Sequence, residues 1–173
     1  ALGYDIAQNL FINKNNLLVE GVSDLIYLTM MSSILEESDL QGIRDDITIV
    51  PVGGLDKVTS FISLLKGQNL NIVCALDTFT DQKGKARLNS LIEQKIIKDK
   101  SILFFDEYDD IAASVIDASK PVIQQINKII GKSRYNHYRP SMTANKLGLS
   151  KGDFSQGTIE RFENLFKKIN SLF

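Results

Sequence analysis

The sequence has one cysteine, no tryptophan, few prolines and almost no net charge. The lone Cys74 excludes an internal disulfide framework and is typical of a reducing compartment. A formal charge of -1 excludes a global basic field, so any nucleic-acid binding must be local. No apolar run approaches the ~18 residues of a membrane span, and no secretory signal is visible. We therefore expect a cytoplasmic protein without membrane segments.

The composition is that of a globular domain. The chain has 173 residues, of which 43% are hydrophobic and 24% charged, and this is enough for one domain with one core. It opens at Ala1 rather than at methionine and soon reaches its first apolar run. We therefore expect it to be a piece of a longer protein.

Four short apolar runs alternate with amphipathic segments. The runs at 17–20, 46–52, 72–77 and 101–105 predict strands, and the segments between them show the spacing of helices. Such alternation is typical of parallel βαβ units. The sequence therefore predicts an α/β fold with a mainly parallel central sheet of about four strands, flanked by helices.

The C-terminal part is predicted to be helical. Its last helix, at about 158–172, gathers apolar side chains on one side. These residues are Phe162, Leu165, Phe166, Ile169 and Phe173. We expect that side to be exposed, which would support a homodimer and packing on a missing domain equally well.

Acidic residues follow two of the predicted strands. Glu20 closes the first apolar run before Gly21, Asp24 falls in the first turn of the next helix, and Asp77 closes the third run. The carboxyl ends of parallel strands meet at one edge, where open α/β sheets bind ligands. A buried carboxylate is costly unless it is paired or bound to metal, so this pattern indicates a divalent-metal site.

Several acids are candidate ligands for two metal ions. Mg²⁺ prefers one or two carboxylates plus water and phosphate oxygens, and two ions about 4 Å apart suit phosphodiester hydrolysis. Glu20 and Asp24 would serve one ion, and Asp77 with Asp81 a second. A third acidic segment, Glu107-Tyr108-Asp109-Asp110, follows the fourth strand.

Each of these residues also has a plainer interpretation. Asp24 alone would complement the helix dipole, Asp77 could be an ordinary turn residue, and the acids at 109–110 could only solvate a helix start. Gly53-Gly54, after the second strand, is either a phosphate-cradling turn or a tight turn, and we favour the tight turn. Cys74 is expected in the core.

Basic residues are concentrated near the C-terminus. Residues 118–152 contain no Asp or Glu, but they contain several Lys and Arg residues with Tyr135, His137 and Tyr138 among them. Basic side chains mixed with aromatic rings suit phosphate contacts and base stacking. A solvated helix face with a loop is the alternative, and His137 is either a general base or a surface residue.

The clearest motif is Val19-Glu20-Gly21-Val22-Ser23-Asp24, between a predicted strand and helix. It resembles the first signature of the Toprim domain, found in topoisomerases, primases and certain nucleases. More closely, Leu-Leu-Val-Glu-Gly-Val-Ser-Asp and the opening residues 1–6 resemble the C-terminal Toprim region of the OLD-family (overcoming lysogenisation defect) ATP-dependent endonucleases. The resemblance covers residues 2–108 well and the remainder loosely.

This resemblance implies a metal-dependent DNA endonuclease or nickase using Mg²⁺ or Mn²⁺, with a role in phage defence. Residues 1–117 would form a Toprim-like, Rossmannoid catalytic domain, and residues 118–173 a helical, basic extension packed on it. Glu20 and Asp24 would hold one ion, and Asp77 would begin the family's Asp-x-Asp motif. The chain departs from that motif at Phe79, so Asp81 is the candidate replacement.

The resemblance also implies further site residues and a partner domain. A later acidic motif of the family resembles 107–111, where we favour Glu107 and Asp110 as metal ligands. A basic residue of the C-terminal part would assist catalysis, and Arg139 and Lys146 are the candidates. No Walker motif occurs in this sequence, so the family's ATPase would be a separate N-terminal domain.

Three other functions compete with the nuclease. Topoisomerase and primase chemistry would require a nucleophilic tyrosine domain or zinc and template-binding parts that the sequence lacks. A receiver domain would use Asp77 as phosphoacceptor, but no lysine follows the fourth strand at Phe105. A degenerate Toprim module would bind DNA or regulate without cutting, and Phe79 favours that alternative.

Overall fold

The computed structural model describes residues 14–53, 57–58, 60–62, 70–76, 82–93, 101–104 and 148–173. By its contacts the chain divides into two compact units. One comprises residues 1–21, 44–107 and 169–173, and the other comprises residues 22–43 and 108–168. The predicted boundary between residues 117 and 118 lies outside the described residues and stays a prediction. None of the described helices is both long and apolar enough to cross a membrane.

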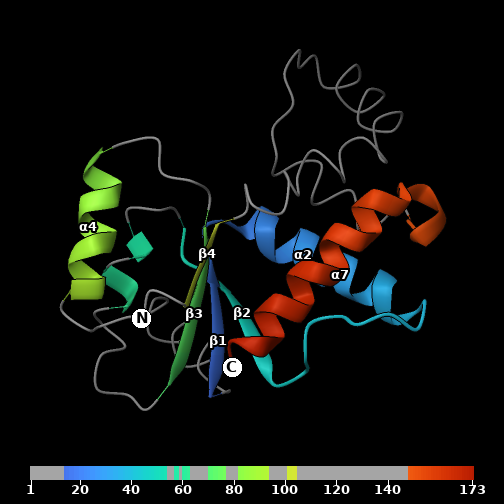
Figure 1. The fold of residues 1–173 in the computed structure, drawn as a ribbon, viewed down its shortest axis with the longest axis horizontal. Coiled ribbons are helices and arrows are strands. Elements are labelled where there is room, and N and C mark those ends of the chain that lie inside the picture. The colour runs from blue at the N-terminus through green and yellow to red at the C-terminus, as the bar shows by residue number, and fades with distance from the viewer. Residues whose placement is uncertain are drawn as a thin grey trace, which may run out of the picture. The chain divides into compact units, whose positions relative to one another are not determined.

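The first unit contains a four-stranded parallel sheet (Figure 1). Its strands are β1 (Asn15–Val19), β2 (Ile47–Pro51), β3 (Asn71–Leu76) and β4 (Ile102–Phe104). Their order is β2-β1-β3-β4, and every neighbouring pair runs parallel. With α-helices in the same chain, this sheet confirms the predicted α/β fold.

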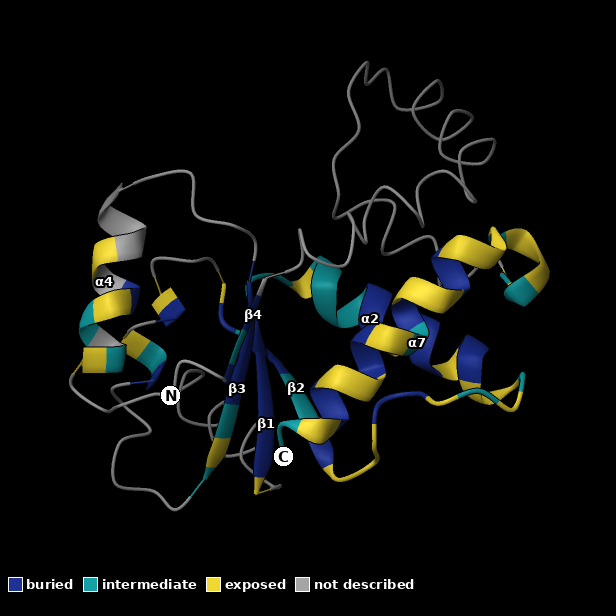
Figure 2. Cartoon of the chain, in the orientation of Figure 1, coloured by how far each residue is buried: buried dark blue, intermediate teal, exposed yellow. Residues whose placement is uncertain are grey.

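β1 lies inside the sheet, and all five of its residues are buried (Figure 2). Strands buried on both faces read as nearly continuous apolar runs, which explains why the Leu-Leu-Val sequence of β1 predicted a strand. The chain passes from β1 to β2 on one side and then crosses to β3 on the other side. The strand order therefore reverses between β1 and β3.

The core of this unit lies against the sheet. Leu18, Val50 and Cys74, one from each of three neighbouring strands, are fully buried there. The helix α4 (Gln82–Glu93) contributes Leu88 to this core. Residues 57–58 and 60–62 are also helical. The whole cluster comprises Leu18, Val50, Val52, Val58, Ile62, Cys74, Leu76 and Leu88.

A network of polar side chains joins the amino-terminal ends of β1, β2 and β3 by hydrogen bonds. Asn15 Nδ2 donates to Asp46 Oδ2 at 2.7 Å, and Asn71 Nδ2 donates to Asn15 Oδ1 at 2.7 Å. Arg44 Nε donates to Asp46 Oδ1 at 2.8 Å, and this pairing lowers the pKa of Asp46. The Arg44 backbone N–H donates to Asn170 Oδ1 at 3.1 Å. The network satisfies the buried Asn15 and ties residue 170 to the sheet.

The second unit contains α2 (Val22–Glu36), a 3-10 helix (Lys151–Asp153) and most of α7 (Gln156–Ser171). The apolar side of α2 is buried from Tyr27 onward. Ser32 Oγ donates to Glu36 Oε1 and accepts the backbone N–H of Ile43, both at 2.8 Å. These two bonds hold the chain that follows α2 against the helix.

The predicted apolar face of α7 is confirmed, but the expectation that it is exposed is wrong. Phe162 and Phe166 are buried, with ring centroids 5.9 Å apart and planes tilted by 51°. Ser155 Oγ accepts the N–H of Thr158 at 3.2 Å, as a helix N-cap does. Because the face is buried within this chain, it gives no support for a dimer. Its buried residues are Ile159, Phe162, Leu165, Phe166 and Ile169.

Cys74 is a core residue, as its place in the strand predicted. It is fully buried in β3, and burial raises the pKa of its thiol to about 12. Only the thiolate reacts with alkylating agents. We therefore expect iodoacetamide at pH 8 to label Cys74 no faster than the protein unfolds, and at once in denaturant. Rapid labelling of the native protein would contradict this burial.

Candidate functional site

Glu20 lies at the carboxyl end of β1, and its backbone is fixed there. It directly follows Val19, the last residue of the strand, and its side chain is half-buried. The Val52 N–H donates to the Val19 carbonyl at 2.9 Å, and the Gly53 N–H donates to the Glu20 carbonyl at 2.9 Å. The pairing of β1 with the β2 segment thus continues beyond both strands and holds Glu20 beside Gly53.

Asp24 lies in the first turn of α2 and is half-buried. A carboxylate in this position is stabilised by the positive end of the helix dipole. The helix begins at Val22, so Ser23 lies inside it. The chain thus becomes helical immediately after Gly21. The strand-turn-helix context expected for Glu20 and Asp24 is therefore present.

The carboxyl ends of β1 and β3 form the switch point of the sheet. Val19 pairs with Ala75, so Glu20 follows β1 at the level where β3 ends with Leu76. In open α/β sheets, ligands bind at the carboxyl edge where the strand order reverses. Asp77 follows Leu76 directly in the sequence. The edge that carries Glu20 is therefore the expected place for a ligand.

The other predicted site residues lie outside the described part of the chain. These residues are Asp77, Asp81, Glu107, Asp110, Arg139 and Lys146. Most of the basic stretch, up to residue 147, lies outside it as well. Among the described residues, no three His, Cys, Asp or Glu side chains are grouped so as to hold a metal ion. The full ligand set therefore stays a prediction.

Glu20 fits a divalent cation by its chemistry and its position. A carboxylate is an oxygen ligand of the kind that Mg²⁺ and Mn²⁺ prefer. Half-burial at the sheet edge leaves part of the side chain open to water, and hydrated Mg²⁺ keeps several water ligands. The neighbouring Gly53 is exposed and has no side chain to cover the edge. Glu20 is therefore a candidate ligand for a divalent cation.

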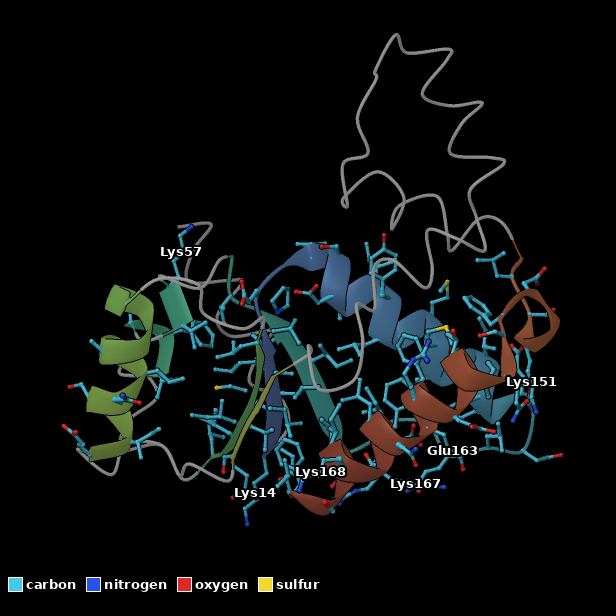
Figure 3. The ribbon with its side chains drawn as sticks, turned by 45° about the horizontal axis from the view of Figure 1, so that its top comes forward. Lys14, Lys57, Lys151, Glu163, Lys167 and Lys168 are labelled. Atoms are coloured by element: carbon cyan, nitrogen blue, oxygen red, sulfur yellow. The ribbon has the colours of Figure 1, made fainter. Side chains whose placement is uncertain are left out.

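Lys57 is a basic residue near this edge that the sequence did not single out (Figure 3). Its Nζ lies 3.6 Å from the point where a Cβ on Gly53 would stand. Lys57 follows Gly53 by four residues, about one helical turn. This spacing is the only sign in the sequence that Lys57 could lie near Gly53. It does not show that the Lys57 side chain lies beside the glycine.

Comparison with known proteins gives a family-model match and some similar solved structures. Residues 11–78 match the family model described as "Overcoming lysogenization defect protein-like, TOPRIM domain". Comparison with curated proteins gives no match. The C-terminal region of the Xanthomonas campestris pv. campestris OLD protein is 15% identical, with a TM-score of 0.45, over 91% of this chain and 97% of that one.

A second similar structure is the C-terminal region of the Burkholderia pseudomallei OLD protein. It is 13% identical, with a TM-score of 0.42, over 90% of this chain and 100% of that one. The family match includes Glu20, Asp24 and Asp77, and the observed parallel sheet agrees with the predicted fold class. Residues 11–78 thus match an OLD-like Toprim family model, in agreement with the resemblance of the first motif.

Proposed function

We propose that this chain is a metal-dependent DNA endonuclease or nickase domain, the nuclease part of a larger ATPase-nuclease. One observation carries the proposal. Glu20, the acid of the first Toprim motif, ends the interior strand β1 at the switch point of a parallel sheet. An acid in that position is suited to bind a hard cation beside a phosphodiester.

In this proposal each candidate residue has one role in metal binding or catalysis. Glu20 and Asp24 hold one Mg²⁺ or Mn²⁺, and Asp77 with Asp81 holds a second. When bound, such ions supply an activated water and stabilise charge on the leaving oxygen. Glu107 and Asp110 complete the acidic edge. Either Arg139 or Lys146 offsets negative charge on the attacked phosphate.

The partners follow from the same assignment. DNA is the proposed substrate, and its phosphates meet the acidic edge only through the bound cations, because bare carboxylates repel them. An N-terminal ATPase domain in the full-length protein is the second proposed partner. A cytoplasmic location and a role in phage defence belong to the same proposal.

Mn²⁺ binding tests this proposal without requiring turnover. We expect Glu20→Gln, which keeps the shape of the side chain but removes its charge, to weaken Mn²⁺ binding by about 100-fold. Loss of orienting groups that do not touch the metal already costs 10- to 100-fold. Titration followed by electron paramagnetic resonance of free Mn²⁺ measures the affinity.

The matched control for this titration is Glu37→Gln. Glu37 is an exposed carboxylate just beyond the end of α2, so its loss should leave Mn²⁺ affinity unchanged. Equal Mn²⁺ affinity in the wild type and Glu20→Gln would contradict a metal site at the first motif.

A degenerate Toprim module that binds DNA without cutting is the second candidate. The observation that favours it is Phe79, which stands where the family's second motif has its second acid. Such a module would retain DNA binding but show no cleavage with Mg²⁺ or Mn²⁺. If Asp81 supplies the missing ligand, cleavage should instead depend on both Asp77 and Asp81.

A further inference from the structure

The turn after β2 brings a cation to the functional edge. Gly53 has a φ of +83°, a conformation that residues with a Cβ rarely adopt. A Cβ on Gly53 would stand 3.6 Å from Lys57 Nζ and 3.7 Å from Lys57 Cδ. The Lys57 side chain therefore lies beside the glycine, and the residue is exposed to solvent.

The base of the Lys57 side chain is anchored by the core. The next residue, Val58, is 2% exposed, and Ile62, one helical turn later, is 1% exposed. Both belong to the core cluster that contains Val50 and Val52 of the same βα segment. Lys57 is thus an exposed residue on a fixed backbone, and holding its ammonium near Gly53 costs little more than side-chain entropy.

Gly53 links Lys57 to Glu20. The Gly53 N–H donates to the Glu20 carbonyl at 2.9 Å, so the two residues are direct neighbours across the β1–β2 pairing. Lys57 Nζ lies 3.6 Å from the Cβ position of Gly53, so Gly53 has Glu20 and Lys57 as neighbours. In the part of the chain that the structure describes, no carboxylate forms an ion pair with Lys57.

We propose that Lys57, beside Gly53, binds a backbone phosphate of the nucleic acid next to the one held at the Glu20 edge. This inference rests on the proposed function and names a residue that positions its substrate. A lysine ammonium is a compact cation with three donors and binds phosphate as a point charge. The phosphate would meet the Lys57 ammonium beside Gly53, whose own N–H is already bonded to the Glu20 carbonyl.

The geometry changes how the Gly53-Gly54 pair is understood. From the sequence alone a tight turn is the better interpretation, because two glycines by themselves are weak grounds for a phosphate site. The structure adds a cation that lies beside the turn, on the edge that also carries Glu20. These two observations are independent of the glycine pair.

The test is the salt dependence of DNA binding by the whole chain, measured by fluorescence anisotropy with a labelled duplex. Measurements in EDTA and in Ca²⁺ separate binding from cleavage. Each neutralised phosphate contributes about 0.9 to the slope of log affinity against log salt for duplex DNA. We expect Lys57→Gln to reduce this slope by about 0.9, and Lys57→Arg to keep it.

Lys14→Gln is the matched control. Lys14 is an exposed lysine of the same unit, but it precedes β1 and lies at the opposite end of the sheet from Lys57 (Figure 3). Its loss should leave the slope unchanged. Equal slopes for Lys57→Gln and Lys14→Gln would overturn the proposal, and so would a wild-type chain that binds no DNA.

The Lys57 proposal and the nuclease proposal can fail separately. In one outcome, Glu20→Gln binds Mn²⁺ as tightly as the wild type while Lys57→Gln has a smaller salt slope of DNA binding. In that case the metal site is wrong and the phosphate contact stands. If Mn²⁺ binding depends on Glu20 while Lys57→Gln binds DNA like the wild type, the metal site stands and the phosphate contact is wrong. Lys57 is exposed, so Lys57→Gln should fold and unfold like the wild type.

Discussion

Asp77→Asn is expected to slow nicking of supercoiled DNA by about 100-fold, as is Glu20→Gln, and the double variant should be little slower than either alone. Asp77 follows β3, and Glu20 follows the neighbouring strand β1 with Val19 opposite Ala75. Both acids are proposed to hold ions that act on one phosphodiester. A loss of about 100-fold corresponds to ~2.7 kcal/mol of transition-state stabilisation.

The comparison of single and double variants tests whether the two acids act together. Groups that form one catalytic unit have strongly non-additive effects, because losing one already disables the unit. Independent sites would instead give a loss of about 10 000-fold in the double variant, the product of the two single losses. Single-turnover rates on supercoiled plasmid measure all three variants.

Two further variants make the result specific. Asp81→Asn should cost about tenfold, ~1.4 kcal/mol, if Asp81 replaces the acid missing at Phe79. Asp45→Asn is the control, because Asp45 is an exposed acid that precedes β2, at the opposite end of that strand from Gly53. Unchanged nicking by Asp77→Asn would show that the second Toprim motif has no part in cleavage.

Phe166→Ala is expected to lower the free energy of unfolding by about 3–5 kcal/mol, the usual cost of removing a buried aromatic ring. Phe166 is 0% exposed, and its ring lies 5.9 Å from that of Phe162 in the same helix. The substitution would leave a cavity within the apolar face of α7. Urea denaturation followed by circular dichroism measures the change.

The control for this experiment is Asn164→Ala, on the exposed side of α7. A surface substitution in a helix usually changes stability by no more than about 0.5 kcal/mol. If Phe166→Ala and Asn164→Ala had the same small effect, the α7 face would not be packed in solution. Self-association measured at the same concentrations would then test the exposed face that the sequence alone suggested.

The strands were predictable because each of the four is mostly apolar and lies in a parallel sheet. The main boundary error concerns β1, which begins at Asn15, two residues before the predicted start at Leu17. Asn15 and Asn16 do not continue an apolar pattern. Asn15 is nevertheless buried, because Asp46 and Asn71 satisfy its amide group. Such a partner, 31 residues away for Asp46, cannot be read from the local pattern.

The burial of the apolar side of α7 could not be predicted, because its partners also lie elsewhere in the chain. An amphipathic helix shows which side is apolar, but not whether the chain itself buries that side. Phe162 and Phe166 are buried within this chain. The apolar side that suggested a dimer is therefore used by the fold of the chain itself.

The candidate site was predictable in part. The place of Glu20 at a strand end, before a glycine and a helix, is confirmed, and the family match covers it. Lys57 was not predictable, because only the folded turn shows its ammonium beside Gly53. Asp77 and Asp81 lie outside the described residues, so their roles stay predictions.

The central claim is that Glu20 belongs to a metal-dependent nuclease site, and cleavage of supercoiled plasmid tests it most directly. Wild-type chain and Glu20→Ala would be incubated with Mg²⁺, with Mn²⁺ and with EDTA. We predict nicked or linear product from the wild type only, and only with a divalent metal. Equal cleavage by Glu20→Ala, or cleavage that persists in EDTA, would contradict the claim.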